Sequence, residues 1–161
     1  MDFVKQLDSN SEIVQGLTPI DIVRLFQYVC EYETNVKVAP GKFDISCKRI
    51  NKIKNKFDIY FDTCAKRNIP KAKKHRFYLL FEQTKNSKAS KDDKAHHLMR
   101  HIRNSIAHGY ISKRSVKKNK GIEEIFEITD KNHDRNTMCG EISINAFYQL
   151  IQELLKSKRK I

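Results

Sequence analysis

Residues 90–109 read SKDDKAHHLMRHIRNSIAHG, and their apolar positions recur at intervals of three and four. This spacing places the apolar side chains on one face of an α-helix. They are Ala95, Leu98, Met99, Ile102 and Ile106. Gly109 follows, and a glycine commonly ends a helix. The stretch therefore predicts a helix that runs to about His108 and packs against a core.

Further helices are expected on both sides of this stretch. Residues 18–21, Thr-Pro-Ile-Asp, resemble a helix start, because Thr caps free amide groups, Pro suits the first turn and Asp returns a capping carboxylate. The same periodicity and turn signals predict the other helices. The expected set is a short helix or two half-helices within residues 3–17, a helix from Pro19 to about Glu33, a long helix between the turn at 39–41 and the break at 68–70, a helix from there to about Lys85, and a last helix after Ser143.

Two strands interrupt the helical pattern near the C-terminus. Residues 122–129 are rich in β-branched side chains and partly alternate, residues 130–136 are a polar turn, and residues 138–142 can pair back. The expected fold is thus mainly α: an antiparallel bundle of about five or six helices in a single domain over 1–161, with a small β-hairpin inserted at about 112–142 before the C-terminal helix.

The charge of the chain points to a polyanionic partner. Thirty-two Lys and Arg stand against 19 Asp and Glu, which gives a formal net charge of +13. Between Lys37 and Arg76 there are thirteen basic residues and three Asp, a local net charge of 13 − 3 = +10. Such an excess favours RNA as the partner. A helix face kept basic for solubility is the alternative.

The cysteines and the hydropathy pattern indicate the compartment. Cys30, Cys47, Cys64 and Cys139 are far apart in the sequence and none forms a C-x-x-C pair, so reduced thiols are expected. No segment resembles a signal peptide, and no apolar run approaches the length of a membrane span. These features predict a cytoplasmic protein that has no membrane partner.

A polar stripe is expected on the helix opposite its apolar face. At 100° per residue, His97, His101, Asn104 and His108 fall within roughly 60° of one another, and Arg100 lies at one edge. Cleavage of RNA without a metal ion requires a proton acceptor, a proton donor and a cation near phosphorus. Histidine and arginine are suited to these tasks.

His97 and His101 also have the i, i+4 spacing of a helical zinc pair. No glutamate accompanies them in an H-E-x-x-H arrangement and no third ligand is evident, so neither a metal nor another cofactor is expected. Three interpretations remain for the two histidines: they contact RNA, they support the residues that touch RNA, or they are simply exposed to solvent.

The sequence of residues 101–109, HIRNSIAHG, resembles the R-x-x-x-x-H signature of the HEPN superfamily. Arg103, the polar Asn104 directly after it, and His108 match that pattern. The resemblance implies a metal-independent endoribonuclease, often a toxin or phage-defence effector, that acts as a homodimer. It implies His108 as general acid and base, Arg103 as phosphate clamp and Asn104 as an orienting partner. Some relatives work beside a nucleotidyltransferase-type antitoxin, and others are non-catalytic RNA-binding or regulatory modules.

Helix geometry bears on how this motif would work. Five residues apart on a regular helix, Arg103 and His108 point about 140° away from each other. Either the helix end unwinds near Gly109 or a two-fold partner supplies the second set of residues. In the structural alternative, Arg103 pairs with a carboxylate and His108 caps the helix C-terminus.

A basic segment follows the motif directly. It contains Lys113, Arg114, Lys117 and Lys118. These side chains are predicted to line the cleft with phosphate contacts, and a solvated mobile loop is the alternative. A helical domain that binds a protein partner without chemistry is the third possible function.

Overall fold

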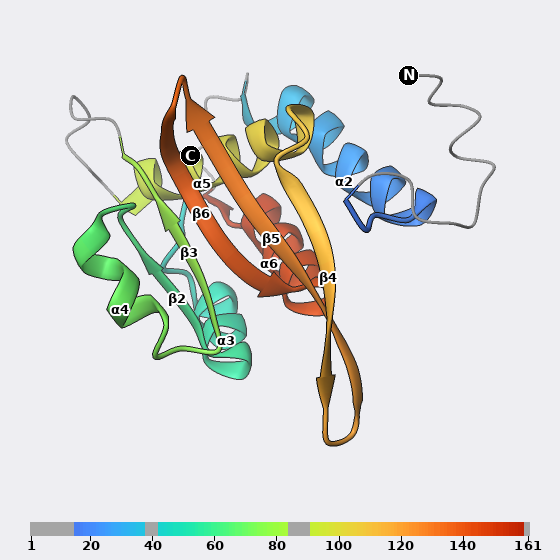
Figure 1. The fold of residues 1–161 in the computed structure, drawn as a ribbon. Helices are drawn as coiled ribbons and strands as arrows, with labels where there is room; N and C mark the ends of the chain where they lie inside the picture. The colour runs from blue at the N-terminus through green and yellow to red at the C-terminus, as the bar shows by residue number, and fades with distance from the viewer. Residues whose placement is uncertain (1–14, 38–41, 84–90, 160–161) are drawn as a thin grey trace.

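A five-stranded mixed sheet forms one layer of the computed structural model, which describes residues 15–37, 42–83 and 91–159 (Figure 1). In spatial order its strands are β2 (Ile59–Asp62), β3 (Phe77–Phe81), β6 (Arg135–Ser143), β5 (Gly121–Asn132) and β4 (Ile111–Lys118). β2 and β3 are parallel, and every other neighbouring pair is antiparallel. The expectation of a mainly α bundle is therefore wrong: the fold is α/β.

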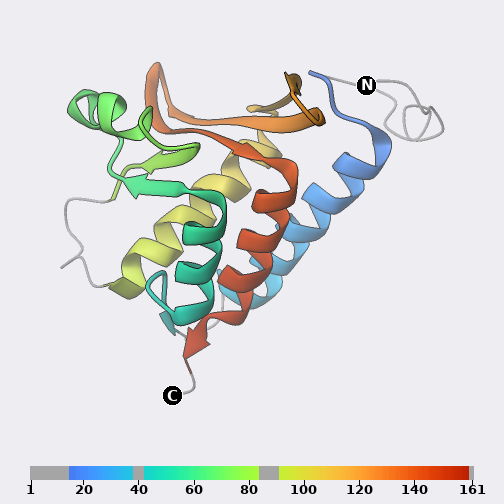
Figure 2. The ribbon, with the colours of Figure 1, turned by 90° about the horizontal axis from the view of Figure 1, so that it is seen from below.

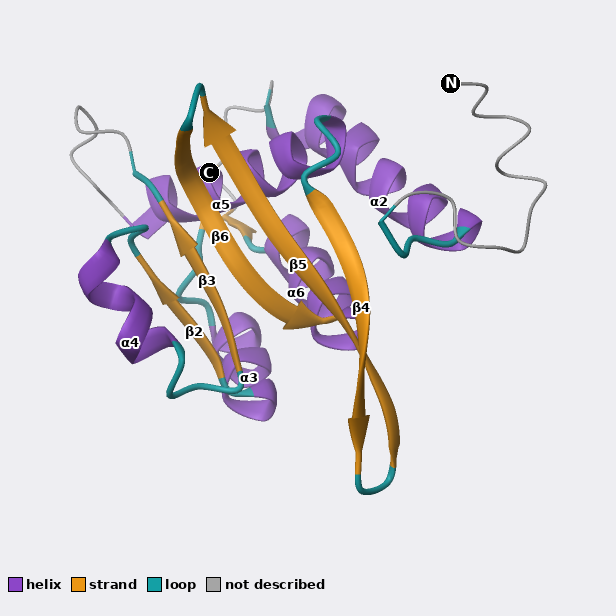
Figure 3. Ribbon diagram, viewed as in Figure 1, coloured by secondary structure: helices purple, strands orange, loops and turns teal. Residues whose placement is uncertain are grey.

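Four long helices cover one face of this sheet (Figure 2). They are α2 (Pro19–Glu31), α3 (Lys48–Phe57), α5 (Lys91–Ala107) and α6 (Ile144–Lys156). The π-helix η1 (Tyr32–Val36) continues α2 without a break. Short helices η2 (Lys66–Asn68) and α4 (Ile69–Ala72) lie beside β2, and β1 (Lys42–Phe43) pairs with β7 (Lys158–Arg159) (Figure 3). Most of the helix expected within residues 3–17 lies outside the described residues.

Several helix boundaries follow the local chemistry of the sequence. Thr18 caps α2, and Asp21 returns its carboxylate to the Thr18 amide at 3.0 Å, so the predicted capping box is present. Ser143 caps α6 through a bond from the Ala146 amide. Asp58 adopts φ +55, and this left-handed residue ends α3 well before the predicted end of the long helix.

The two strands β2 and β3 occupy segments that were predicted as helices. Phe57, Phe61 and Cys64 have helical spacing, yet Ile59–Asp62 is extended and pairs in parallel with β3. The run at 77–81, FYLLF, is buried on both faces, and a short continuous apolar run fits a central strand as well as a helix. Partners far away in the sequence decide between the two, and β6 supplies them for β3.

The predicted hairpin is confirmed but is longer than expected. β5 and β6 pair from Ile125–Ser143 to Asn132–Arg135, with a register shift between Asp130 and Lys131. The segment from Lys113 onward is no loop: it forms β4, which pairs along its whole length with β5. The inserted hairpin is thus the larger part of the sheet.

The core lies between the sheet and the four helices. The apolar face of α5 is buried as predicted, with Leu98, Met99 and Ile102 at 0% exposure. The rings of Phe126 on β5 and Phe147 on α6 meet edge to face at 5.3 Å. Within the described residues, no helix is both long and apolar enough to cross a membrane. The packing fixes α5 against β5 and so places the end of α5 beside the sheet.

Candidate active site at the end of helix α5

The motif lies where α5 ends and the chain reverses into β4. α5 is regular up to Ala107, so His108 is the first residue beyond it. Gly109 adopts φ +72, a conformation that favours glycine, and the Tyr110 amide donates to the Ser105 carbonyl oxygen at 2.8 Å. The His108 amide still donates to the Asn104 carbonyl oxygen at 2.9 Å, so the helical path reaches His108, and on such a path Arg103 and His108 point about 140° apart.

Two hydrogen bonds, one to a carboxylate and one to an amide, hold the Arg103 side chain. Its Nε donates to Glu33 Oε1 at 2.8 Å, and its Nη1 donates to Asn104 Oδ1 at 3.1 Å. Glu33 comes from the π-helix η1, so the end of α2 helps to position the arginine. The Arg103 side chain remains 28% exposed. A guanidinium has five N–H donors, and these two bonds occupy two of them, which leaves donors for an anion.

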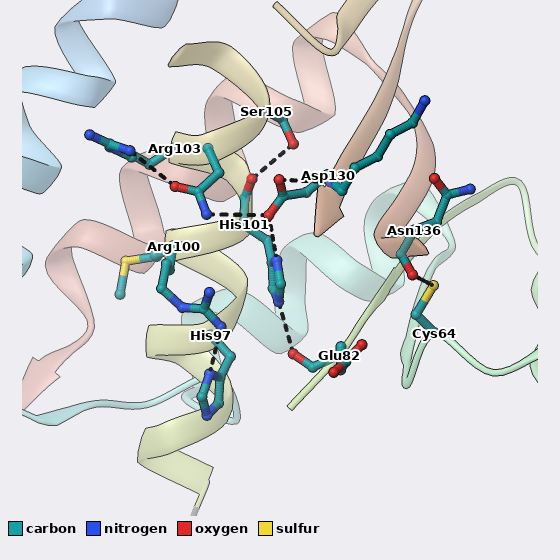
Figure 4. Close-up of polar contacts among 12 residues, drawn as sticks. Cys64, Glu82, His97, Arg100, His101, Arg103, Ser105, Asp130 and Asn136 are labelled. Atoms are coloured by element: carbon teal, nitrogen blue, oxygen red, sulfur yellow. Dashed lines mark hydrogen bonds and ion pairs between the residues drawn. The ribbon is translucent and has the colours of Figure 1, made fainter. Parts of the chain in front are cut away.

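Asn104 connects Arg103 to a buried carboxylate on β5. While its Oδ1 accepts from Arg103, its Nδ2 donates to Asp130 Oδ2 at 3.3 Å (Figure 4). The Asp130 side chain is 3% exposed and also accepts from the Lys131 amide at 2.9 Å. An orienting role for Asn104 was predicted, and this geometry offers one: the amide holds the guanidinium relative to the sheet.

His101 lies inside the protein, although the helical wheel places it on the polar stripe opposite the apolar face. It is 2% exposed, its Nδ1 lies 2.8 Å from Asp130 Oδ2, and its Nε2 lies 2.9 Å from the Glu82 carbonyl oxygen. A carbonyl oxygen only accepts, so Nε2 carries a proton. Both ring nitrogens are engaged by oxygen atoms, so in this arrangement the ring supports the site from within rather than contacting RNA.

The Asp130 carboxyl is ionised despite its burial. Burial alone would raise its pKa, but the hydrogen bonds from His101 and Asn104 outweigh burial and hold the pKa below the ordinary value. A carboxylate on one side and a carbonyl on the other hold the His101 ring at both of its nitrogens. The result is a continuous chain of polar contacts from Glu82 through His101, Asp130 and Asn104 to Arg103 (Figure 4).

His108 is exposed and lies among groups that the sequence pattern did not single out. The edge of its ring meets Tyr110 with centroids 6.0 Å apart, and Lys131 Nζ lies 5.5 Å from the centre of the Tyr110 ring. Tyr110 is 38% exposed. An imidazole, a phenol ring and an ammonium group thus share one accessible patch. Tyr110 follows the motif by two residues, but Lys131 comes from β5 and only the fold brings it here.

A small pocket of about 260 Å³ adjoins the polar chain on the side of Arg100. Asn104, Asp130, Lys131 and Thr137 line it together with Arg100. Arg100 Nη2 lies 3.3 Å from His97 Nδ1. Arg100 therefore lies beside Asn104 at this pocket, and His97 contacts Arg100 from the preceding turn of α5.

The basic residues after the motif do not line a cleft around His108. Lys113 Nζ pairs with Asp21 Oδ2 on α2 at 2.7 Å, and both side chains are at most 10% exposed. Arg114 pairs with Glu127 and Glu141 across the sheet. Lys117 and Lys118 belong to the far end of the projecting β4–β5 hairpin (Figure 1). The segment is a strand that runs away from the motif, so it is no mobile loop, and its contact with phosphate stays a prediction.

The basic stretch between Lys37 and Arg76 also lies elsewhere. It covers α3, η2 and α4, which flank β2 on the opposite side of the molecule from the end of α5 (Figure 1). The candidate site and this basic surface are separate features.

Comparison with known families matches most of the chain. A family model described as HEPN pEK499 p136 matches residues 21–160, which include the motif and all five strands of the main sheet. No curated protein and no solved structure matches the chain significantly.

Proposed function

Because the chain belongs to the HEPN superfamily through the family HEPN pEK499 p136, we propose that it is a metal-independent endoribonuclease that uses Arg103 and His108. Membership supports a nuclease or RNA-related function in general. Two features of the motif carry the finer proposal. Glu33 and Asn104 hold Arg103 and leave some of its donors unused, and His108, five residues later, is exposed.

The chemistry follows from what these groups are able to do. His108 takes the proton of a ribose 2′-hydroxyl, and the 2′-oxygen attacks the adjacent phosphorus. The bond from phosphorus to the 5′-oxygen breaks, the leaving oxygen takes a proton from an imidazolium, and a 2′,3′-cyclic phosphate remains. Arg103 binds the non-bridging oxygens with a planar donor fork while their charge increases.

A second copy of the chain is part of the proposal. On a helix that is regular to Ala107, Arg103 and His108 diverge by about 140°, so a cleft with a base, an acid and a clamp needs residues from two subunits. An apolar surface on α2 supports association: Val23 and Phe26 are 45% and 42% exposed beside a groove of about 1150 Å³ between α2 and α6. Phe26→Glu is expected to give a monomer in light scattering with loss of cleavage.

The deciding experiment compares variants on mixed single-stranded and structured RNA in the presence of EDTA. His108→Ala should lower the cleavage rate roughly 10²- to 10⁴-fold, the range for loss of a general acid or base. His133→Asn is the matched control, because His133 is an exposed histidine at the β5–β6 turn. Wild-type protein should release ends that carry 2′,3′-cyclic phosphate. Equal cleavage by wild type and His108→Ala, or no cleavage by either, contradicts the proposal.

Growth of an expressing host gives a second, independent test of a toxin or phage-defence role. Wild-type protein should arrest growth, and Arg103→Ala should relieve the arrest at equal protein level. If a nucleotidyltransferase-type antitoxin restrains the protein, co-expression of such a partner should restore growth. Normal growth with active wild-type enzyme contradicts the toxin role and leaves the nuclease proposal standing.

The separate basic surface on α3 favours one other function, a non-catalytic RNA-binding module. Lys52 and Lys56 are exposed on α3 beside the α6 helix. In that case the affinity for RNA should fall steeply with salt and should be weakened by charge removal at these lysines. His108→Ala should then leave the affinity unchanged, and wild-type protein should not cleave.

A further inference from the structure

Two of the four cysteines meet in the fold although they are 75 residues apart. Cys64 Sγ lies 4.0 Å from Cys139 Sγ, and neither residue takes part in the candidate nuclease site. Both are partly exposed. Sequence spacing gave no sign of this pair, and Cys64 lies in the turn after β2 rather than inside the predicted helix.

The strand register explains why Cys64 and Cys139 lie close together. Leu80 on β3 has Asp62 of β2 as its partner on one side and Cys139 of β6 on the other. The turn after Asp62 passes over β3 toward β6, and Asn68 fixes it through bonds from Nδ2 to the Thr63 carbonyl and hydroxyl oxygens at 3.0 and 2.9 Å. The two sulfur atoms therefore meet across β3.

The contact makes the two thiols chemically unequal. The hydrogen bond from Cys139 stabilises the Cys64 thiolate and lowers the pKa of Cys64 to about 7, although burial alone would raise it. The same contact, together with burial, raises the pKa of Cys139. A thiolate is the nucleophile in disulfide exchange, so Cys64 should attack first and Cys139 should act as the resolving thiol.

We propose that Cys64 and Cys139 are a redox-modification site that closes to a reversible disulfide in the presence of a low-molecular-weight disulfide. The Cys64 thiolate attacks one sulfur of the external disulfide, which forms a mixed disulfide and releases one thiolate. The Cys139 thiol then loses its proton to solvent and attacks the Cys64 sulfur, which releases the second thiolate. The two protein thiols are oxidised by two electrons, and the external disulfide is reduced to two thiols.

The disulfide would form next to the strand that supports the candidate site. Cys64 Sγ contacts the Asn136 carbonyl oxygen at 3.8 Å (Figure 4). The next carbonyl oxygen, of Thr137, accepts from the Glu82 amide at 2.8 Å. Glu82 in turn accepts from His101. The sulfur atoms must approach from 4.0 Å to about 2.05 Å, and the turn that carries Cys64 can supply this movement more easily than the central strand β6.

The test is oxidation of the full chain in glutathione buffers of increasing disulfide content, followed by alkylation and peptide mass spectrometry. Wild-type protein should lose two thiols without gaining glutathione, and one cross-linked peptide should contain both cysteines. Cys139→Ser should instead hold glutathione on Cys64. A Cys30→Ser/Cys47→Ser variant is the control and should cross-link like wild type. The oxidised protein should melt about 10 °C higher, because the link closes a long loop, and dithiothreitol should reverse the shift.

Failure of the proposal has a clear signature. If glutathione modifies the exposed Cys30 while Cys64 and Cys139 stay reduced and unlinked, the site does not exist. A cross-link between any other pair of cysteines overturns it as well. None of these measurements depends on RNA cleavage, so the outcome is independent of the proposed nuclease function.

Discussion

Replacement of Asp130 by alanine tests the polar chain that supports Arg103. The carboxylate is 3% exposed and accepts from His101, Asn104 and the Lys131 amide. Alanine removes all three hydrogen bonds and leaves the His101 ring facing an apolar methyl group. Each buried donor left without an acceptor costs about 1–3 kcal/mol of unfolding free energy, so the loss of the three bonds together is expected to cost about 3–5 kcal/mol. For a domain of this size that corresponds to a fall in Tm of roughly 6–20 °C.

The measurement is guanidinium-induced unfolding followed by far-UV circular dichroism at pH 7. Asp134→Ala is the matched control, because it removes the same charge from an exposed position in the β5–β6 turn. Such a surface change should alter the unfolding free energy by less than about 0.5 kcal/mol. If Asp130→Ala differs from Asp134→Ala by no more than this, the buried chain does not stabilise the fold and the reasoning fails.

The pKa of Asp130 also predicts how its contribution to stability changes with pH. The pKa of Asp130 is lower in the folded protein than its ordinary value of 3.8, so the folded state favours the carboxylate. The stabilisation is complete above the unfolded-state pKa and is lost as pH falls through the lower folded-state pKa. The difference in stability between wild type and Asp130→Ala should therefore be constant from pH 7 to about 5 and should shrink below about 4. A difference that grows on acidification refutes the assignment.

Three further substitutions test the packing around the site. Gly140→Ala should destabilise by about 1–3 kcal/mol in thermal unfolding, because its Cβ would lie 2.6 Å from a backbone oxygen on β3. Lys113→Met should cost about 3 kcal/mol, because it leaves the buried Asp21 carboxylate without its cation, whereas Lys117→Met on the exposed part of β4 should be neutral within about 0.5 kcal/mol. Tyr28→Phe should cost about 1 kcal/mol, because the hydroxyl donates at 2.8 Å to a buried backbone oxygen of α5.

The helices were predictable where caps and one-sided apolar spacing agree. Thr18 and Ser143 begin α2 and α6 as their sequences indicate, and the apolar face of α5 is the buried one. The prediction failed at β2, β3 and β4, because the local sequence pattern there does not identify a strand. A five-residue apolar run such as 77–81 satisfies helix and strand alike, and its state depends on pairing with β6, more than fifty residues later in the chain.

The residues of the candidate site also fall into two groups, those that the sequence indicated and those that it did not. Arg100 and Asn104 were singled out because helical spacing places them near one face of the helix, and Arg103 was singled out through its match to the family signature. Residues brought by other elements were missed. Glu33 reaches Arg103 from η1, and Asp130 reaches Asn104 from β5. A single buried aspartate in a polar turn segment has no sequence signal, because its importance comes entirely from the register of the sheet.

The fold explains why an asparagine suits position 104, directly after the arginine of the motif. Its side chain must accept from the Arg103 guanidinium and at the same time donate to the Asp130 carboxylate. An amide does both at once with two different atoms. A carboxylate at this position would face Asp130 as a like charge and would lack a donor, and a methyl group would offer neither bond. Asn104 therefore transmits the fixed position of the buried His101–Asp130 pair to the one cation that the proposed chemistry places on the phosphate.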